Sequence, residues 1–219
     1  MIAPKANAAF VAAMEDILAV YKRPRDEAFP LVCLDETSKQ LIKEKRAPIP
    51  MTKGHARRVD YEYERNGVAN LFMAFAPLEG WRHVEVTDHR AAIDYAGMLK
   101  DISDKHFPHA RKIVLVQDNL STHKPAALYA AFPAAEARRL VERFEWHYTP
   151  KHGSWLDMAE SELAVLSSQC LDRRITDKAN LVREVAAWVQ ARNKNNAVAD
   201  WQFTTDDARI KLRHLYPAF

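Results

Sequence analysis

Cysteine and long apolar runs are scarce in this chain of 219 residues, and each scarcity argues against a class of protein. The two cysteines, Cys33 and Cys170, lack nearby partners at ligand spacing, which argues against a zinc site or a disulfide framework. No apolar run approaches the roughly 20 residues of a membrane span, and the first residues lack a signal-peptide pattern. The sequence therefore predicts a cytoplasmic protein with buried free thiols.

Composition and charge suit a globular domain more than a strongly basic nucleic-acid binder. Hydrophobic residues make up 48% of the chain and charged residues 28%, which is enough for a sizeable core. The formal net charge is +3. Because this excess is small, local clusters of charge must decide whether nucleic acid is a partner.

One such cluster lies between residues 39 and 58, which prolines and a glycine interrupt. A charged run of this kind is often only a solvated loop. Its large positive excess, directly after a candidate metal ligand, also suits contacts with DNA phosphates. The candidates are Lys43, Lys45, Arg46, Lys53, Arg57 and Arg58.

Two short apolar segments each end in carboxylates. Residues 113–117 run into Asp118, and residues 31–34 run into Asp35 and Glu36. Both read as strands buried on two faces, and open α/β sheets place their chemistry at the carboxyl ends of such strands. Asp35 and Asp118 are therefore candidates for one site, with Glu36 interpreted as a solvated neighbour.

A helix is expected to begin at Ser154, with Ser154 as its N-cap and Asp157 at the capping-box position. A helical wheel places Glu160 on the sheet-facing stripe and turns Glu162 away from it. A glutamate within an apolar stripe is costly unless a cation meets it. Glu160 is therefore predicted to join the two aspartates.

The remaining elements follow from periodicity and turn residues. Residues 6–21 predict an amphipathic helix and residues 22–30 a linker, and Asn66-Gly67 predicts a hairpin turn. Residues 61–65 before that turn alternate with period two, and strands are expected after it at 68–76 and 81–87, around a turn at Pro77 to Gly80, and at 144–148. A helix is expected at 91–106, with Ile93, Met98 and Ile102 inward. Further helices are expected from Ser121 or Thr122 to 144 with a break at Pro133, from Thr176 to 192, and from Thr204 or Thr205 onwards.

This order fits an α/β fold, a ribonuclease-H-like mixed five-stranded sheet of order 3-2-1-4-5 flanked by helices. The domain would occupy residues 31–219, with residues 1–30 forming an N-terminal helix and linker. Adjacent strands lie about 4.8 Å apart, so Asp35 and Asp118 would end side by side. With Glu160, they would bind two Mg²⁺ or Mn²⁺ ions, which prefer oxygen ligands.

Three segments resemble the signature blocks of DDE transposases, most closely the mariner-related insertion sequence 630 family. They are Asp35-Glu-Thr, Asp118-Asn-Leu-Ser-Thr-His123, and the run from Tyr148 to Glu160. The resemblance implies metal-dependent DNA strand cleavage and strand transfer during DNA transposition. In that mechanism one ion activates water or a DNA 3′-hydroxyl, and the other stabilises the leaving oxygen.

Further roles are implied by the same resemblance. Asp35 would bridge both ions, with Asp118 on one and Glu160 on the other. Asn119 and His123 follow the second aspartate as in the family, and His123 would either contact the scissile phosphate, orient Asp118 or simply start a helix. Lys151 and His152 could contact phosphate. Expected partners are transposon ends, a target such as TA, and a second copy of the chain, in a prokaryotic nucleoid.

Two departures from the family stand out. Asp157 occupies a position where family members usually have asparagine, and it is expected to serve the helix start. Members also carry an N-terminal helix-turn-helix region, for which the residues before Leu31 are too few. The chain is therefore expected to be a catalytic domain without that region. The alternatives are a non-catalytic DNA-binding remnant of a transposase and a ribonuclease-H-like nuclease.

Overall fold

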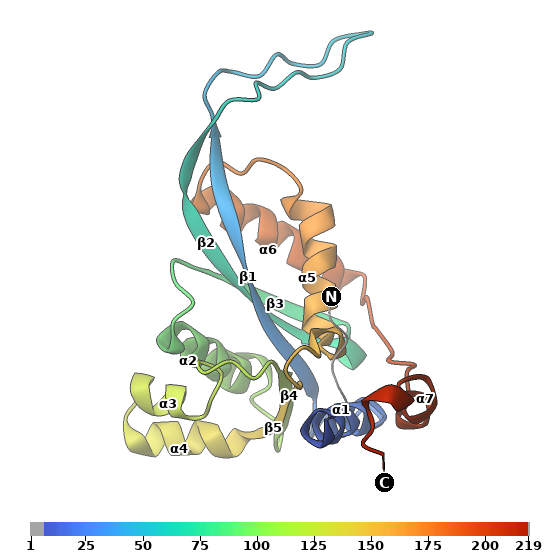
Figure 1. The fold of residues 1–219 in the computed structure, drawn as a ribbon. Coiled ribbons are helices and arrows are strands. Elements are labelled where there is room, and N and C mark those ends of the chain that lie inside the picture. Colours follow the sequence, from blue (N-terminus) through green and yellow to red (C-terminus); the bar gives the residue numbers. More distant parts are fainter. Residues whose placement is uncertain (1–6, 219) are drawn as a thin grey trace.

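A five-stranded sheet of order β3-β2-β1-β4-β5 forms the centre of the computed structural model, which describes residues 7–218 (Figure 1). β1 pairs antiparallel with β2 and parallel with β4, and β5 is parallel to β4. The predicted strand order is confirmed. The strands are β1 Leu31–Glu44, β2 Tyr63–Ala76, β3 Trp81–Thr87, β4 Ile113–Gln117 and β5 Phe144–Tyr148.

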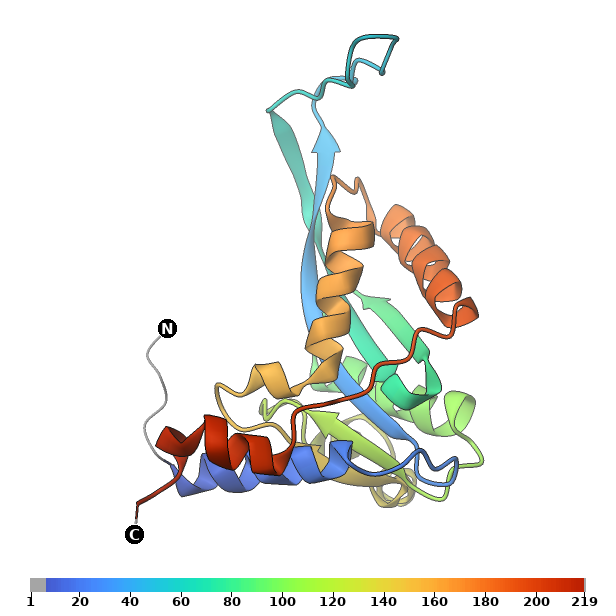
Figure 2. The ribbon, with the colours of Figure 1, turned by 90° about the vertical axis from the view of Figure 1, so that its right-hand side faces the viewer.

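Helices cover both faces of this sheet (Figure 2). One core joins α1, α5, α6 and α7 to inward residues such as Cys33 and Val116, and the other joins α2, α3 and α4 to residues such as Leu34 and Leu115. Alternate strand residues thus face opposite cores. The helices are α1 Ala8–Tyr21, α2 Ala92–Asp101, α3 Ala126–Ala131, α4 Ala134–Arg143, α5 Met158–Leu166, α6 Lys178–Lys194 and α7 Thr205–Lys211.

Short helical turns extend several of these helices. Two are π-helical continuations, at the ends of α2 and α5, and three are 3₁₀ turns. Within the described part of the chain, no helix is long and apolar enough to cross a membrane. The turns are η1 Pro77–Glu79, η2 Ile102–His106, η3 Ser154–Leu156, η4 Ser167–Leu171 and η5 Arg213–Leu215.

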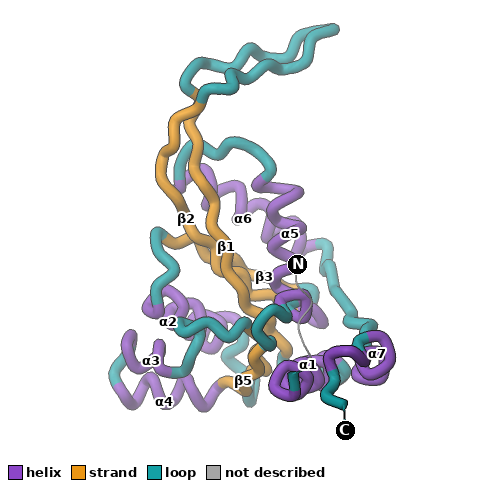
Figure 3. Tube along the Cα trace, viewed as in Figure 1, coloured by secondary structure: helices purple, strands orange, loops and turns teal. Residues whose placement is uncertain are grey.

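The β1–β2 hairpin is longer than predicted, and its tip projects from the body of the protein (Figures 1 and 3). β1 continues through the first part of the basic segment, and only residues 45–62 form the connecting loop. The predicted hairpin turn at Asn66-Gly67 is wrong. Both residues lie within β2 opposite a single residue of β1, where the register shifts. They form a β-bulge, and Gly67 supplies the required positive φ of 91°.

Three smaller predictions are also corrected. α3 begins after Pro125 and not at Ser121 or Thr122, and the N-cap of α6 is Asp177 in place of Thr176. Ile93, expected inside, is 64% exposed because Tyr95, Ala96, Met98 and Leu99 supply the buried face of α2. The free cysteines, the break at Pro133 and the N-cap at Thr204 are confirmed.

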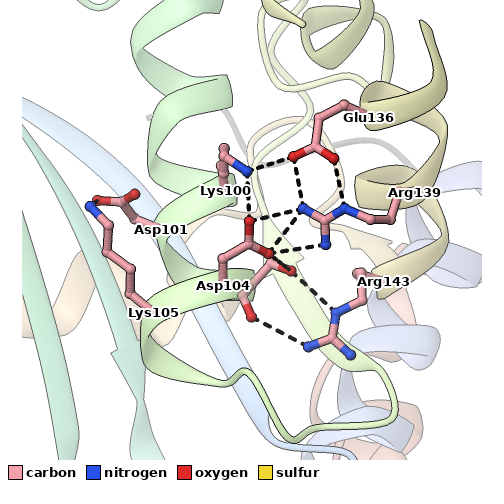
Figure 4. Close-up of polar contacts among 8 residues, drawn as sticks. Lys100, Asp101, Asp104, Lys105, Glu136, Arg139 and Arg143 are labelled. Carbon is pink, nitrogen blue, oxygen red and sulfur yellow. Dashed lines mark hydrogen bonds and ion pairs between the residues drawn. The ribbon is translucent and has the colours of Figure 1, made fainter. Parts of the chain in front are cut away.

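An ion-pair network joins α4 to α2 and η2 on the second face (Figure 4). Arg139 binds Asp104 at 2.8 Å and Glu136 at 2.8 Å, and Lys100 binds Asp104 at 2.7 Å. Arg143 donates to the Phe107 carbonyl at 2.8 Å. These contacts fix the helices that support β4 and β5.

The turn between β2 and β3 is expected to tolerate no side chain at Gly80. Its φ is +58°, and an added Cβ would lie 2.3 Å from Oδ1 and 2.9 Å from the backbone carbonyl carbon of Asn196. Gly80→Ala is expected to lower the free energy of unfolding by more than the roughly 1–2 kcal/mol of a left-handed conformation. Urea denaturation measures it. The control is Gly97→Ala in α2, where nothing lies within 4 Å and alanine should stabilise; equal losses in both would contradict the prediction.

Candidate active site

Asp35 and Asp118 occupy equivalent places on neighbouring parallel strands. Leu34 pairs with Gln117, so the next residue of each chain segment is one of the two aspartates. Both follow, two residues on, side chains that face the α1–α5 core, namely Cys33 and Val116. The pairing of these acids was predicted, but Asp35 lies within β1 and not at its end. Beyond Asp35, β1 continues in the sheet paired with β2, whereas β4 ends at Gln117.

The charge of Glu160 acts on Asp35 together with that of Asp118. Burial raises the pKa of Asp35 to about 7, against a hydrogen bond from the backbone N–H of Glu36, and the charges of Glu36, Asp118 and Glu160 raise it further. Three carboxylates from β1, the end of β4 and the first turn of α5 therefore act on one another. Such a cluster attracts cations.

The start of α5 differs from the prediction. Residues 154–156 form the separate 3₁₀ turn η3, and Asp157 then adopts an extended backbone, so α5 begins at Met158. Asp157 is the N-cap, and its Oδ1 accepts from the Ala159 N–H at 2.8 Å. Ser154 makes no capping hydrogen bond.

The predicted helix face was wrong for the two glutamates of α5. Glu160 is exposed, whereas Glu162 is buried. Arg82 of β3 and Arg192 of α6 explain this burial, because each lies 2.9 Å from Glu162 Oε1. The buried acid thus has the cations that burial requires, and it belongs to the packing of α5 on β3 and α6. Glu160 remains free of such pairing with the described residues.

His123 connects Asp118 to a carboxylate that sequence reasoning had dismissed. Its Nδ1 contacts Asp118 Oδ1, and its Nε2 lies 3.1 Å from Glu36 Oε2. Burial lowers the pKa of His123, but the hydrogen bonds to both acids outweigh burial and raise the pKa to about 9. The ring stacks on Tyr95 with centroids 4.7 Å apart. His123 is buried between Asp118 and Glu36, and the interpretation of Glu36 as solvated is wrong.

Tyr21 is a second residue near the site whose contacts no sequence pattern indicated. It ends α1, and its hydroxyl donates to the Leu156 carbonyl at 2.6 Å and accepts from the Met158 N–H at 3.4 Å. A buried phenol needs such partners. Tyr21 thereby fixes the chain immediately before α5, and α1 shares the core of the sheet.

The basic candidates fall into two separate groups. Lys151 and His152 are exposed beside Asp118, which directly follows β4, and they line a cavity of about 350 Å³ with Asp118 and Asn119. The second group lies on the β1–β2 hairpin, whose tip projects from the body of the protein (Figure 1), and all its members are exposed. Two of them pair with hairpin acids. The group is Lys43, Lys45, Arg46, Lys53, Arg57 and Arg58, with ion pairs Lys45–Glu62 and Arg46–Asp60.

The donor set fits a divalent cation chemically, because Asp35, Asp118 and Glu160 offer only carboxylate oxygens. Burial, and then the charges of the neighbouring acids, raise the pKa of Asp35, and a bound cation would offset the repulsion among these acids. Across residues 7–218, however, no three His, Cys, Asp or Glu side chains stand in an arrangement that holds an ion between them. Asp118 is directed to His123 instead.

The comparisons with known proteins agree with this architecture. Three solved structures of Mos1 mariner complexes are similar at 14% identity. The paired-end complex with Mg has a TM-score of 0.60, with 100% of this chain and 66% of that chain covered. The TM-score is 0.57 for the paired-end complex with Mn, with 98% and 63% covered, and 0.55 for the strand transfer complex, with 93% and 58% covered. The chain thus spans 63% of the length of the Mos1 chain in the paired-end complex with Mn. No curated protein matches.

The fold is therefore ribonuclease-H-like, as predicted, in common with Mos1 transposase. A family model described as the DDE superfamily endonuclease matches residues 30–182, which include all three candidate acids. The match covers more than half of the chain. The protein belongs to the DDE superfamily of endonucleases.

Proposed function

We propose that this chain is a transposase catalytic domain that cleaves and joins DNA strands in DNA transposition, with Asp35, Asp118 and Glu160 as its catalytic acids. The observation that carries the proposal is the register of β1 and β4, which sets Asp35 and Asp118 side by side, with Glu160 of α5 among the charges that raise the pKa of Asp35. The family match includes all of them. Membership in a family of endonucleases favours a nuclease over a DNA-binding remnant.

The acids would hold two Mg²⁺ or Mn²⁺ ions, with Asp35 shared between them, Asp118 on one and Glu160 on the other. Such ions activate an attacking oxygen and stabilise the leaving oxygen in a phosphoryl transfer. Mos1 complexes have been solved with Mg and with Mn, which supports the choice of ion.

The other residues would bind and orient. The Glu36–His123 pair sets the direction of Asp118, and Tyr21 holds the chain that leads into α5. Lys151 and His152, exposed at the cavity beside Asp118, would contact the phosphates that flank the cleaved bond. The cations of the projecting hairpin would contact the DNA backbone at a distance from that bond, and such contacts weaken with added salt.

The proposed partner is double-stranded DNA, namely transposon ends and a target such as TA, bound by two copies of the chain. Complexes of Mos1 with paired transposon ends and in strand transfer support this proposal. Handling two DNA ends together requires two active sites, which favours a homodimer.

The test is metal-dependent nicking of supercoiled plasmid and of labelled duplex DNA by the whole chain. Nicks that require Mg²⁺ or Mn²⁺, with joining of a 3′-hydroxyl end to a second duplex, are the expected result. Metal-independent DNA binding without cleavage would favour the remnant. Cleavage of RNA–DNA hybrids without joining would favour a ribonuclease-H-like nuclease.

His123→Asn should reduce Mg²⁺-dependent nicking by roughly 10–100-fold, the usual effect of losing a residue that orients a metal ligand. The shorter side chain cannot reach both Glu36 and Asp118, so Asp118 loses its fixed direction. Mn²⁺ binding by calorimetry should weaken in parallel. Thr122→Ala, a change at the preceding residue, is the control. Normal nicking by the His123 variant with intact folding would refute the orienting role.

A further inference from the structure

Asp157 is the one acid near the site whose chemistry the proposed function leaves unused. It is 2% exposed, and only one of its two carboxylate oxygens has a partner among the described residues. Oδ1 caps α5 through the Ala159 N–H, whereas Oδ2 is buried and unbonded. Burying a carboxylate oxygen without a partner is costly. A helix cap alone does not explain that cost, because asparagine caps equally well.

No Lys, Arg or His side chain among residues 7–218 pairs with Asp157, and the charged groups that act on it most strongly are acids. Burial raises the pKa of Asp157 well above its usual range, and the charges of Asp35, Asp118 and Glu160 raise it further. The nearby hydroxyl of Tyr21 cannot serve Oδ2, because its proton is donated to the Leu156 carbonyl at 2.6 Å. The unbonded oxygen therefore lies in the electrostatic field of all three candidate catalytic acids, and no described cation pairs with it.

We propose that Asp157 is a fourth carboxylate of the divalent-cation site, with Oδ1 holding the start of α5 and Oδ2 available to an ion bound at Asp35. This inference rests on the proposed function, since it requires the cation site of the three acids. It gives each oxygen one role. It also couples metal binding to the first turn of α5, because the residue that caps the helix would itself be a ligand.

The experiment is to measure Mn²⁺ affinity by calorimetry and by electron paramagnetic resonance for the parent, Asp157→Asn, Asp35→Asn and Asp177→Asn. Asparagine preserves the cap at residue 157, so the fold is retained. Asp177 is the matched control, since its Oδ1 caps α6 at 2.8 Å from the Asn180 N–H and its Oδ2 is hydrogen bonded. We expect Asp157→Asn to weaken Mn²⁺ binding at least about tenfold, in line with loss of a metal-site group, and Asp177→Asn to leave it unchanged.

Thermal unfolding supplies a second readout. With Mn²⁺, the parent should gain more stability than the variant, since a ligand that binds the folded state stabilises it by mass action.

The outcomes separate the two proposals. If Asp35→Asn loses Mn²⁺ and Asp157→Asn binds it as tightly as the parent, Asp157 is a cap only and this inference is overturned while the proposed function stands. If the parent itself binds no Mn²⁺ or Mg²⁺, the proposed function fails, and the inference fails with it.

Discussion

Glu160→Gln is expected to fold like the parent and to nick DNA in Mg²⁺ more than about 100-fold more slowly, since even residues that only orient metal ligands are worth roughly 10–100-fold. Glu160 is exposed in the first turn of α5 and makes no hydrogen bond or ion pair with any residue the structure describes. Folding therefore does not depend on it. Its proposed role is confined to the cation site.

The matched control is Glu162→Gln, the same chemical change two residues further along α5. Glu162 is committed to Arg82 and Arg192, so this variant should be less stable yet should nick DNA normally at temperatures where it is folded. Plasmid nicking and urea denaturation of both variants decide the matter. An active Glu160→Gln beside a folded but inactive Glu162→Gln would reverse the assignment of the third acid.

Glu162→Leu should have the largest effect on stability, lowering the free energy of unfolding by about 3–5 kcal/mol, as expected when one partner of a buried ion pair is removed. Arg82 is 0% exposed and would keep its charge without the carboxylate. Its other contacts are neutral: the carbonyls of Gly80 at 3.1 Å and Ala197 at 2.7 Å, Asn193 Oδ1 at 3.4 Å and the ring of Phe75. These do not neutralise a guanidinium.

Thermal or chemical unfolding measures this loss, which corresponds to a fall in Tm of about 6–20 °C for a chain of this size. The control is Glu142→Gln, which removes the exposed pair Arg138–Glu142 at 2.7 Å. That pair is worth at most about 1 kcal/mol. A loss in Glu162→Leu no greater than in the control would show that the buried pairing contributes little.

Much of the fold follows from local patterns. The apolar runs that became β4 and β5, the turn at residues 77–80 and the break at Pro133 were predictable because each depends on neighbouring residues. The sheet order followed from the sequence of elements. The bulge at Asn66-Gly67 did not, because the same dipeptide serves a tight turn or an extra residue within a strand. The choice depends on how far β1 extends opposite it.

The site was less predictable, for two physical reasons. The helical wheel treats the residues from Ser154 onward as one continuous helix. In the structure, η3 and the extended backbone of Asp157 interrupt it before α5 begins. Burial of Glu162 depends on Arg82, which is far away in the chain, so no periodicity reveals it. The link from Glu36 through His123 to Asp118 is likewise a matter of tertiary contact.

The hydroxyl of Tyr21 has a mechanical consequence. α1 ends at this residue, and the short bond from the phenol to the Leu156 carbonyl ties that end to the chain entering α5. A shift of α1 along its axis would therefore pull on the residues that carry Asp157 and Glu160. α1 thus helps to hold the start of α5 in place. Removing residues 1–30 would free the segment that carries Asp157 and Glu160.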